Sequence, residues 1–252
     1  SGYGNLAFAL GAMATVVVVT GTWGAASLRA GGRAPAHRRR TLLAAAAVFA
    51  VVIVADGHPS LGTDVGGVLA LVPAGVVVLV MLNNVAVRPR HVLVAVAATA
   101  GAAAAFAAVD LAQPEAARTH VGRFAAQLLG GDANVGTIIE RKIAANLSLL
   151  FSSIWALLIP VALAFLVFVV RRRQGILRRL EAQIPGLRAG LVGALVLAVL
   201  GGALNDSGVA VPAMMLAVLL PFITFLGLQL PPAVPSRLGP TEAAVCRGLD
   251  RR

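Results

Sequence analysis

The chain has 252 residues, of which 59% are hydrophobic and only 12% are charged, and this composition excludes an ordinary water-soluble domain. A formal charge of +11 would suggest nucleic-acid binding in a soluble protein. Here, however, the basic residues lie between apolar runs, and with only 5% aromatic residues the chain lacks a surface for base stacking. The single cysteine, Cys246, excludes an internal disulfide and any site that needs several cysteines.

Seven apolar runs follow one another along the chain. They cover residues 5–28, 41–55, 65–82, 91–109, 147–170, 189–204 and 209–230. Because about 20 helical residues cross a hydrocarbon core of about 30 Å, five runs are long enough to span a membrane, whereas residues 41–55 and 189–204 are short. Both short runs end in a turn that contains an aspartate, so we expect their ends to leave a polar depression in one membrane surface.

This pattern predicts an all-α, polytopic helical membrane protein with about seven transmembrane helices in residues 1–230. Residues 231–252 are rich in proline and polar side chains, and we expect them to form a disordered cytoplasmic tail. If successive connections lie on alternate sides of the membrane, 17 of the 21 basic residues lie on one side and seven of the ten acidic residues lie on the other. By the positive-inside rule the basic side is cytoplasmic, which puts the amino terminus outside a bacterial cytoplasmic membrane.

The connection at residues 171–188 also has a helical pattern. Its apolar residues Leu177, Leu180 and Ile184 recur at helical spacing among arginines, which is typical of a basic helix that lies on an anionic membrane surface.

Residues 110–146 are neither a span nor a short connection, and they contain two amphipathic patterns. The first places His120, Arg123 and Gln127 beside Val121, Phe124 and Leu128. The second places Ile139, Ile143 and Leu147 on one side and Lys142 and Asn146 on another. We expect two short helices at the outer membrane interface, the first ending at Gly130 and Gly131 and the second leading directly into the fifth span.

Two groups of polar residues in the outer connections are candidates for ligand binding. His120, Arg123, Arg141 and Lys142 could bind the phosphate of a lipid or a diphosphate, although a solvated basic helix face explains them equally well. Asn205 and Asp206 form a polar turn directly after a span, where helix capping is the preferred alternative to a chemical role. Asp64 and Ser207 also precede apolar runs and are candidate helix caps.

The acidic and histidine residues of the outer connections have the right chemistry for zinc or manganese, but their spacing matches no metal motif. We therefore interpret them as solvated loop residues and predict no cofactor. They are Asp56, His58, Asp64, Asp110, Glu115, His120, Asp132, Glu140 and Asp206. The sequence also contains no recognised catalytic motif.

Three short motifs carry a resemblance to a known group of proteins: THVGRF at 119–124, IIERKIAANL at 138–147 and NDSGV at 205–209. They resemble the carboxyl-terminal membrane region of bacterial, chiefly actinobacterial, membrane proteins of unknown function in which a domain similar to the alkaline phosphatase superfamily precedes several spans. The resemblance covers residues 56–221. It implies that any hydrolase activity and its metal ligands reside in an upstream domain, and that seven residues are recurrent motif positions: His120, Arg123, Arg141, Lys142, Asn146, Asn205 and Asp206.

These observations give a leading hypothesis: a cell-envelope membrane module that binds or presents a lipid or a phosphorylated substrate to an extracytoplasmic domain located before Ser1. The chain opens without methionine and without basic residues ahead of its first span, which led us to expect that domain. The expected partners are therefore membrane lipids and this domain, and not nucleic acid. A transporter or lipid flippase and a purely structural anchor are the alternatives, although no charged residue occupies the middle of a predicted span, as proton-coupled transport usually requires.

Overall fold

The computed structural model describes residues 4–30, 35–130, 135–151, 154–172, 175–205 and 207–231. Within these ranges the chain forms α-helices, one short 3-10 helix and no β-strand. The predicted site residue Asp206 and the predicted tail beyond residue 231 lie outside the described residues.

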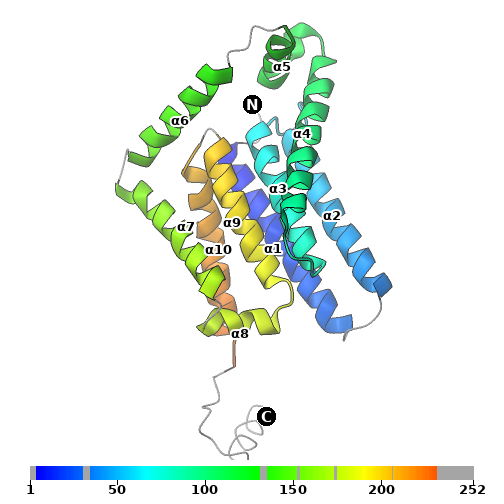
Figure 1. Cartoon of the computed structure of the whole chain (residues 1–252), viewed down its shortest axis with the longest axis vertical. Helices are drawn as coiled ribbons and strands as arrows, with labels where there is room; N and C mark the ends of the chain where they lie inside the picture. The colour runs from blue at the N-terminus through cyan, green and yellow to red at the C-terminus, as the bar shows by residue number, and fades with distance from the viewer. Residues whose placement is uncertain are drawn as a thin grey trace, which may run out of the picture.

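Helices α1, α2, α3, α4, α9 and α10 run up and down along one axis, whereas α8 lies across one end of the bundle (Figure 1). In chain order they are α1 (Asn5–Ala30), α2 (Pro35–Gly57), α3 (Val65–Leu82), α4 (Pro89–Leu111), η1 (Glu115–Ala117), α5 (His120–Gly130), α6 (Val135–Phe151), α7 (Ile154–Arg172), α8 (Gly175–Gln183), α9 (Leu187–Leu204) and α10 (Ala210–Leu228). Among the described residues six helices are long and apolar enough to cross a membrane, namely α1, α2, α3, α4, α9 and α10. The prediction of an all-α, polytopic membrane protein is confirmed.

Successive helices alternate between two ends of the bundle. We call the end that carries α5 the pocket end and the end that carries α8 the basic end (Figure 1). Arg29, Arg88, Arg90 and the arginines of α8 lie at the basic end, as the alternation of charges in the sequence predicts. In α8, Leu177 and Leu180 are buried against the rest of the bundle, whereas Ile176 is exposed.

The region of the expected fifth span differs from the prediction. Residues 147–170 were expected to form one helix, but α6, to Phe151, and α7, from Ile154, run in different directions (Figure 1). Residues 152 and 153 between them lie outside the described residues. Neither helix is among the six candidate spans, and together they lead from the pocket end back to α8 (Figure 1).

The two runs that looked too short for a span form longer helices than the apolar stretches alone suggest. Helix α2 begins at Pro35, and its candidate span extends from Arg38 to Gly57 over 20 residues. Helix α9 begins at Leu187 and has 18 residues. Both are candidate spans, because an arginine can continue a helix while its aliphatic stem reaches toward the membrane surface.

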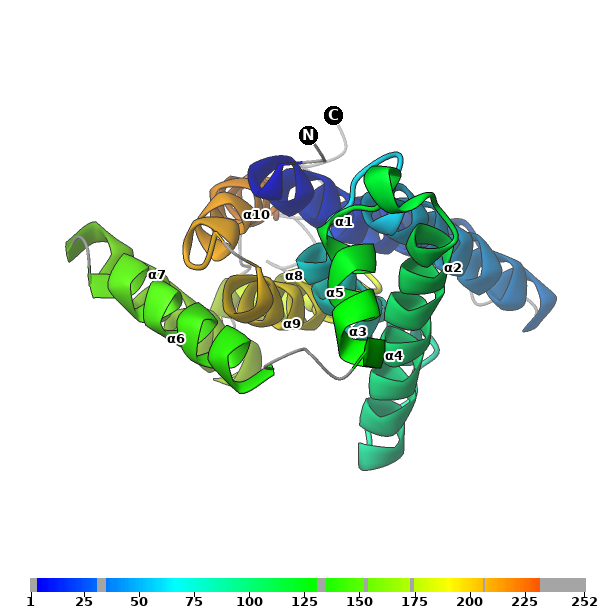
Figure 2. The ribbon, with the colours of Figure 1, turned by 90° about the horizontal axis from the view of Figure 1, so that it is seen from above.

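Helix α3 lies at the centre of the bundle, packed against α2, α4 and α9 (Figure 2). Its residues Leu71, Ala74 and Val78 are fully buried in the core. Helix α9 approaches α3 closely because it has no side chain at Gly193: a Cβ built there would lie 2.2 Å from Cγ2 of Val78. Small residues at such positions are a common means of packing helices within membranes.

The first prediction concerns this contact. Gly193→Ala should lower the melting temperature in detergent, because the added methyl group overpacks a site in which the β-branched Val78 has little freedom to turn, at a cost of roughly 1–3 kcal/mol. Gly101→Ala on α4 is the matched control, since a Cβ there meets nothing within 4 Å and should leave stability unchanged or raised. Equal melting temperatures for the two variants would contradict the close packing of α3 and α9.

Candidate functional site

At the pocket end, hydrogen bonds join the start of α3 to the end of α9. Asp64 is the N-cap of α3, and its Oδ1 accepts from the Gly67 N–H at 2.9 Å, so the predicted capping role is confirmed. The Asn205 side chain donates from Nδ2 to both Asp64 oxygens, at 3.4 and 3.1 Å. Ser207 is not a side-chain cap of α10; its hydroxyl accepts from Asn5 Nδ2 at 2.6 Å instead. The polar turn after α9 therefore connects α1, α3 and α9.

A second set of hydrogen bonds fixes α5 on the end of α4. Asp110 is completely buried, and its carboxyl group accepts from the Thr119 N–H at 3.1 Å, the Thr119 hydroxyl at 2.5 Å and the Gly122 N–H at 2.6 Å. These bonds satisfy amide groups in the first turn of α5. A Cβ at position 122 would lie 2.7 Å from Asp110 Oδ2, so the glycine is what lets the carboxyl group approach.

The interpretation of Asp56 and Asp110 as solvated loop residues was wrong. Both lie in the last turns of helices, where the following connection folds back over them, and Asp56 is only 4% exposed. Neither carboxyl oxygen of Asp56 has a hydrogen-bond partner in the structure. Among the described residues, no three His, Cys, Asp or Glu side chains are placed to share a metal ion.

Helix α6 contacts the bundle through the carboxyl end of α9. Lys142 Nζ donates to the Leu204 carbonyl at 2.9 Å, and Asn146 Nδ2 donates to the Ala203 carbonyl at 3.2 Å. The last carbonyl groups of a helix have no partner within it and carry partial negative charge, so a lysine and an amide are suitable donors there.

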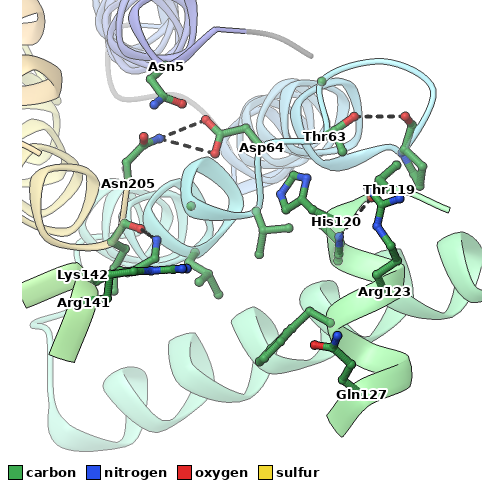
Figure 3. A pocket seen from close by; sticks show the side chains of 18 residues that line it. Asn5, Thr63, Asp64, Thr119, His120, Arg123, Gln127, Arg141, Lys142 and Asn205 are labelled. Carbon is green, nitrogen blue, oxygen red and sulfur yellow. Dashed lines mark hydrogen bonds between the residues drawn. The ribbon is translucent and has the colours of Figure 1, made fainter. Parts of the chain in front are cut away.

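These contacts enclose a pocket of about 930 Å³ between α5, α6 and the ends of α3 and α9 (Figure 3). Five of the seven predicted site residues line it: His120, Arg123, Arg141, Lys142 and Asn205. Asn146 lines an adjoining pocket of about 290 Å³, which shares Arg141, Lys142 and Asn205 with the first. Residues from three separate parts of the sequence are thus brought together at one site.

The pocket is positively charged. Arg123 projects from α5, while Arg141 and Lys142 project from α6 on the other side (Figure 3). Among the described residues of the lining, Asp64 is the one carboxylate, and its oxygens already accept from Gly67 and Asn205. Among the described residues, neither the Arg123 nor the Arg141 guanidinium has a hydrogen-bond or ion-pair partner. Two exposed guanidinium groups on opposite walls are therefore available to an anionic group in the pocket.

The turn at residues 58–64 also lines the pocket and was missed as part of a site. Thr63 has a φ of 59°, which is rare for a β-branched residue, and its hydroxyl donates to the Pro59 carbonyl at 3.0 Å. A Cβ at Gly62 would lie 2.0 Å from the Asp56 carbonyl oxygen. The sequence signal for this turn, a Gly-Thr-Asp triplet before an apolar run, predicts a loop but not its position opposite α5.

Comparison of the chain with protein-family models, with curated protein sequences and with solved structures finds no match. The functional argument therefore depends on the geometry of this pocket.

The second prediction concerns the anchoring of α5. Asp110→Asn should place an amide donor against the donors of Thr119 and Gly122, and the loss of a cap typically costs about 0.5–2 kcal/mol. The amides of Thr119 and Gly122 should then exchange hydrogen roughly 2–30-fold faster, as measured by hydrogen–deuterium exchange. Glu115→Gln, in the exposed η1 turn, is the control and should not change exchange. Unchanged exchange in Asp110→Asn would show that α5 is held by other contacts.

Proposed function

We propose that the chain is a membrane module that binds the phosphate group of a lipid or envelope substrate in the pocket between α5 and α6 and presents it at the extracytoplasmic surface. The observation that carries this proposal is the placement of Arg123 and Arg141 on opposite walls of one pocket, where neither has a partner in the part of the chain that the structure describes. A guanidinium group binds a phosphate through two parallel hydrogen bonds, and two such groups can hold one phosphate from two sides.

The distribution of charge supports an extracytoplasmic position for the pocket. The basic end carries Arg38, Arg39, Arg40, Arg88 and Arg90 in addition to the arginines that follow α7, and the positive-inside rule assigns such an end to the cytoplasm. The sequence motifs also support an extracytoplasmic position, because the bacterial membrane proteins that they resemble have a phosphatase-like domain before the spans. We propose that a domain of this kind receives the substrate above the pocket.

The core beneath the pocket favours presentation over transport. Phe8, Leu71 and Leu197 fill the bundle below the pocket, and each is at most 2% exposed. Of the buried polar residues described in this core, Thr15 and Thr20 donate to carbonyl groups of their own helix. The buried Asp56 carboxyl group lies, like Phe8, against Gly67 in the first turn of α3, at the pocket end. A transporter needs a polar path between the two ends, whereas these side chains close the pocket below. A purely structural anchor, in turn, has no need for two unpaired arginines in a pocket.

The third prediction tests the ligand site. Arg123→Gln and Arg141→Gln should each weaken binding of phosphatidic acid to the protein in phosphatidylcholine nanodiscs by roughly ten- to one-hundred-fold, because each removes a charge-assisted interaction worth about 1.5–3 kcal/mol. Binding can be measured by native mass spectrometry. Arg40→Gln removes the same charge at the basic end and should leave this binding unchanged. An equal loss in all three variants would mean that net charge, and not the pocket, attracts the lipid.

The fourth prediction tests the side of the membrane. In a Cys246→Ser background, a cysteine at the exposed position Gln113 should react with an impermeant maleimide added to intact cells, since it lies at the pocket end. A cysteine at the exposed position Ala86, at the basic end, should react only after the cells are opened. The opposite labelling pattern would place the pocket in the cytoplasm and contradict an extracytoplasmic function.

A further inference from the structure

We propose a second lipid site, at the basic end of the bundle, that binds one anionic phospholipid from the adjacent membrane leaflet. A separate pocket of about 450 Å³ lies there, between the first turns of α2, the carboxyl end of α3 and the start of α4. Its lining residues are Arg39, Leu42, Leu43, Ala46, Leu79, Val80, Asn83, Val85 and His91. None of them belongs to the pocket between α5 and α6, so this proposal does not depend on the function proposed above.

The polar part of this pocket is cationic. Arg39 is exposed and, among the described residues, has no hydrogen-bond or ion-pair partner. Its neighbour Arg38 is used differently, because Nη2 of Arg38 donates to the Leu82 carbonyl at the end of α3, at 3.5 Å. The described connections around the pocket, residues 35–40 and 83–90, contain no acidic residue. An anion here would therefore meet no nearby carboxylate.

Two donors converge on the ring of His91 beside this pocket. Nδ1 of His91 accepts from the Arg88 N–H at 2.9 Å, while the Nε–H of Arg90 is directed at Nε2 of His91, 3.3 Å away. A neutral imidazole has only one unprotonated nitrogen and the charged form has none, so the ring cannot accept from both donors. When Nδ1 of His91 accepts from the Arg88 N–H, Nε2 carries a proton and faces a second donor, the Nε–H of Arg90. An anionic oxygen beside Nε2 would accept from both groups.

The remaining lining is apolar and continues toward the hydrocarbon region. Leu42 and Leu79 pack against the core, whereas Leu43 is 58% exposed on the outer surface of α2. A cationic mouth next to an apolar wall suits a molecule with an anionic head group and hydrocarbon chains, and basic recesses between transmembrane helices commonly bind such lipids. A small soluble anion would use only the cationic mouth.

The test compares phosphatidylglycerol with zwitterionic phosphatidylcholine, by native mass spectrometry of the full chain released from nanodiscs. Arg39→Gln and Arg90→Gln should each lower phosphatidylglycerol binding about five-fold, the effect of removing about 1 kcal/mol of attraction per cation. Arg40→Gln removes the same charge from the adjacent, exposed position outside the pocket lining and should leave phosphatidylglycerol binding unchanged. Arg123→Gln acts on the other pocket, so the loss caused by Arg39→Gln should have the same size in its presence as in its absence. Phosphatidylcholine binding should be the same in Arg39→Gln, Arg90→Gln and the native chain.

Three results would overturn the proposal. Equal binding of the two lipids by the native chain would exclude a charge-selective site. An equal loss in Arg39→Gln and Arg40→Gln would replace the site with general attraction to a basic surface. A loss in Arg123→Gln, with Arg39→Gln unaffected, would place the bound lipid at the pocket end and leave the function proposed for that pocket standing.

Discussion

The pair of hydrogen bonds between Asp64 and Asn205 is the constraint on which the pocket end depends. Asp64 begins α3 and Asn205 follows the last turn of α9, so this one contact fixes the relative height of the two helices at the centre of the bundle. Asn205 is 2% exposed, and at that depth an amide without a partner would cost roughly 1–3 kcal/mol. The pairing therefore specifies one register of α3 against α9, and the turns that follow from it form the floor of the pocket.

The charged side chains around that floor have two different roles. Lys142 binds the end of α9 and so positions α6, while the buried carboxyl group of Asp110 positions α5 on the opposite side. The Lys142 ammonium group and the Asp110 carboxyl group thus both have hydrogen-bond partners within the protein. Arg123 and Arg141 then project from the two positioned helices into the space between them. The structural contacts thus position the two walls, and the Arg123 and Arg141 guanidinium groups face the pocket without a partner among the described residues.

Much of the fold was predictable because apolar runs, glycines and arginines obey strong constraints in a membrane. Residues 65–82 were predicted to the residue, and α5 was found from the spacing of His120, Arg123 and Gln127. Helix bounds were less predictable where arginines continue a helix, as they do at the start of α2, and where the helix direction changes within an apolar run, as it does between α6 and α7 (Figure 1).

The candidate site was predictable as a set of residues but not as a geometry. Residues of α5, of α6 and of the turn after α9 were expected on one side of a membrane, yet nothing in their spacing indicated that they line one pocket. The roles of Asp56 and Asp110 could not be predicted, because burial of a carboxyl group at the end of a helix depends on how the next connection folds over it. Pairings across the fold, such as Lys142 with the Leu204 carbonyl, likewise have no signal in local sequence.

The central claim is that Arg123 and Arg141 hold one phosphate group between α5 and α6. The most direct measurement is the distance from lipid phosphorus to guanidinium nitrogen, by solid-state NMR dephasing of ¹⁵N-arginine protein in bilayers that contain phosphatidic acid. Arg123→Lys and Arg141→Lys assign the signals, because each removes one guanidinium group and keeps the charge. The account predicts that both guanidinium groups lie within hydrogen-bonding range of phosphorus, about 4 Å, and that each substitution removes one short distance. Short distances that persist in both variants, or that arise only from arginines at the basic end, would contradict it.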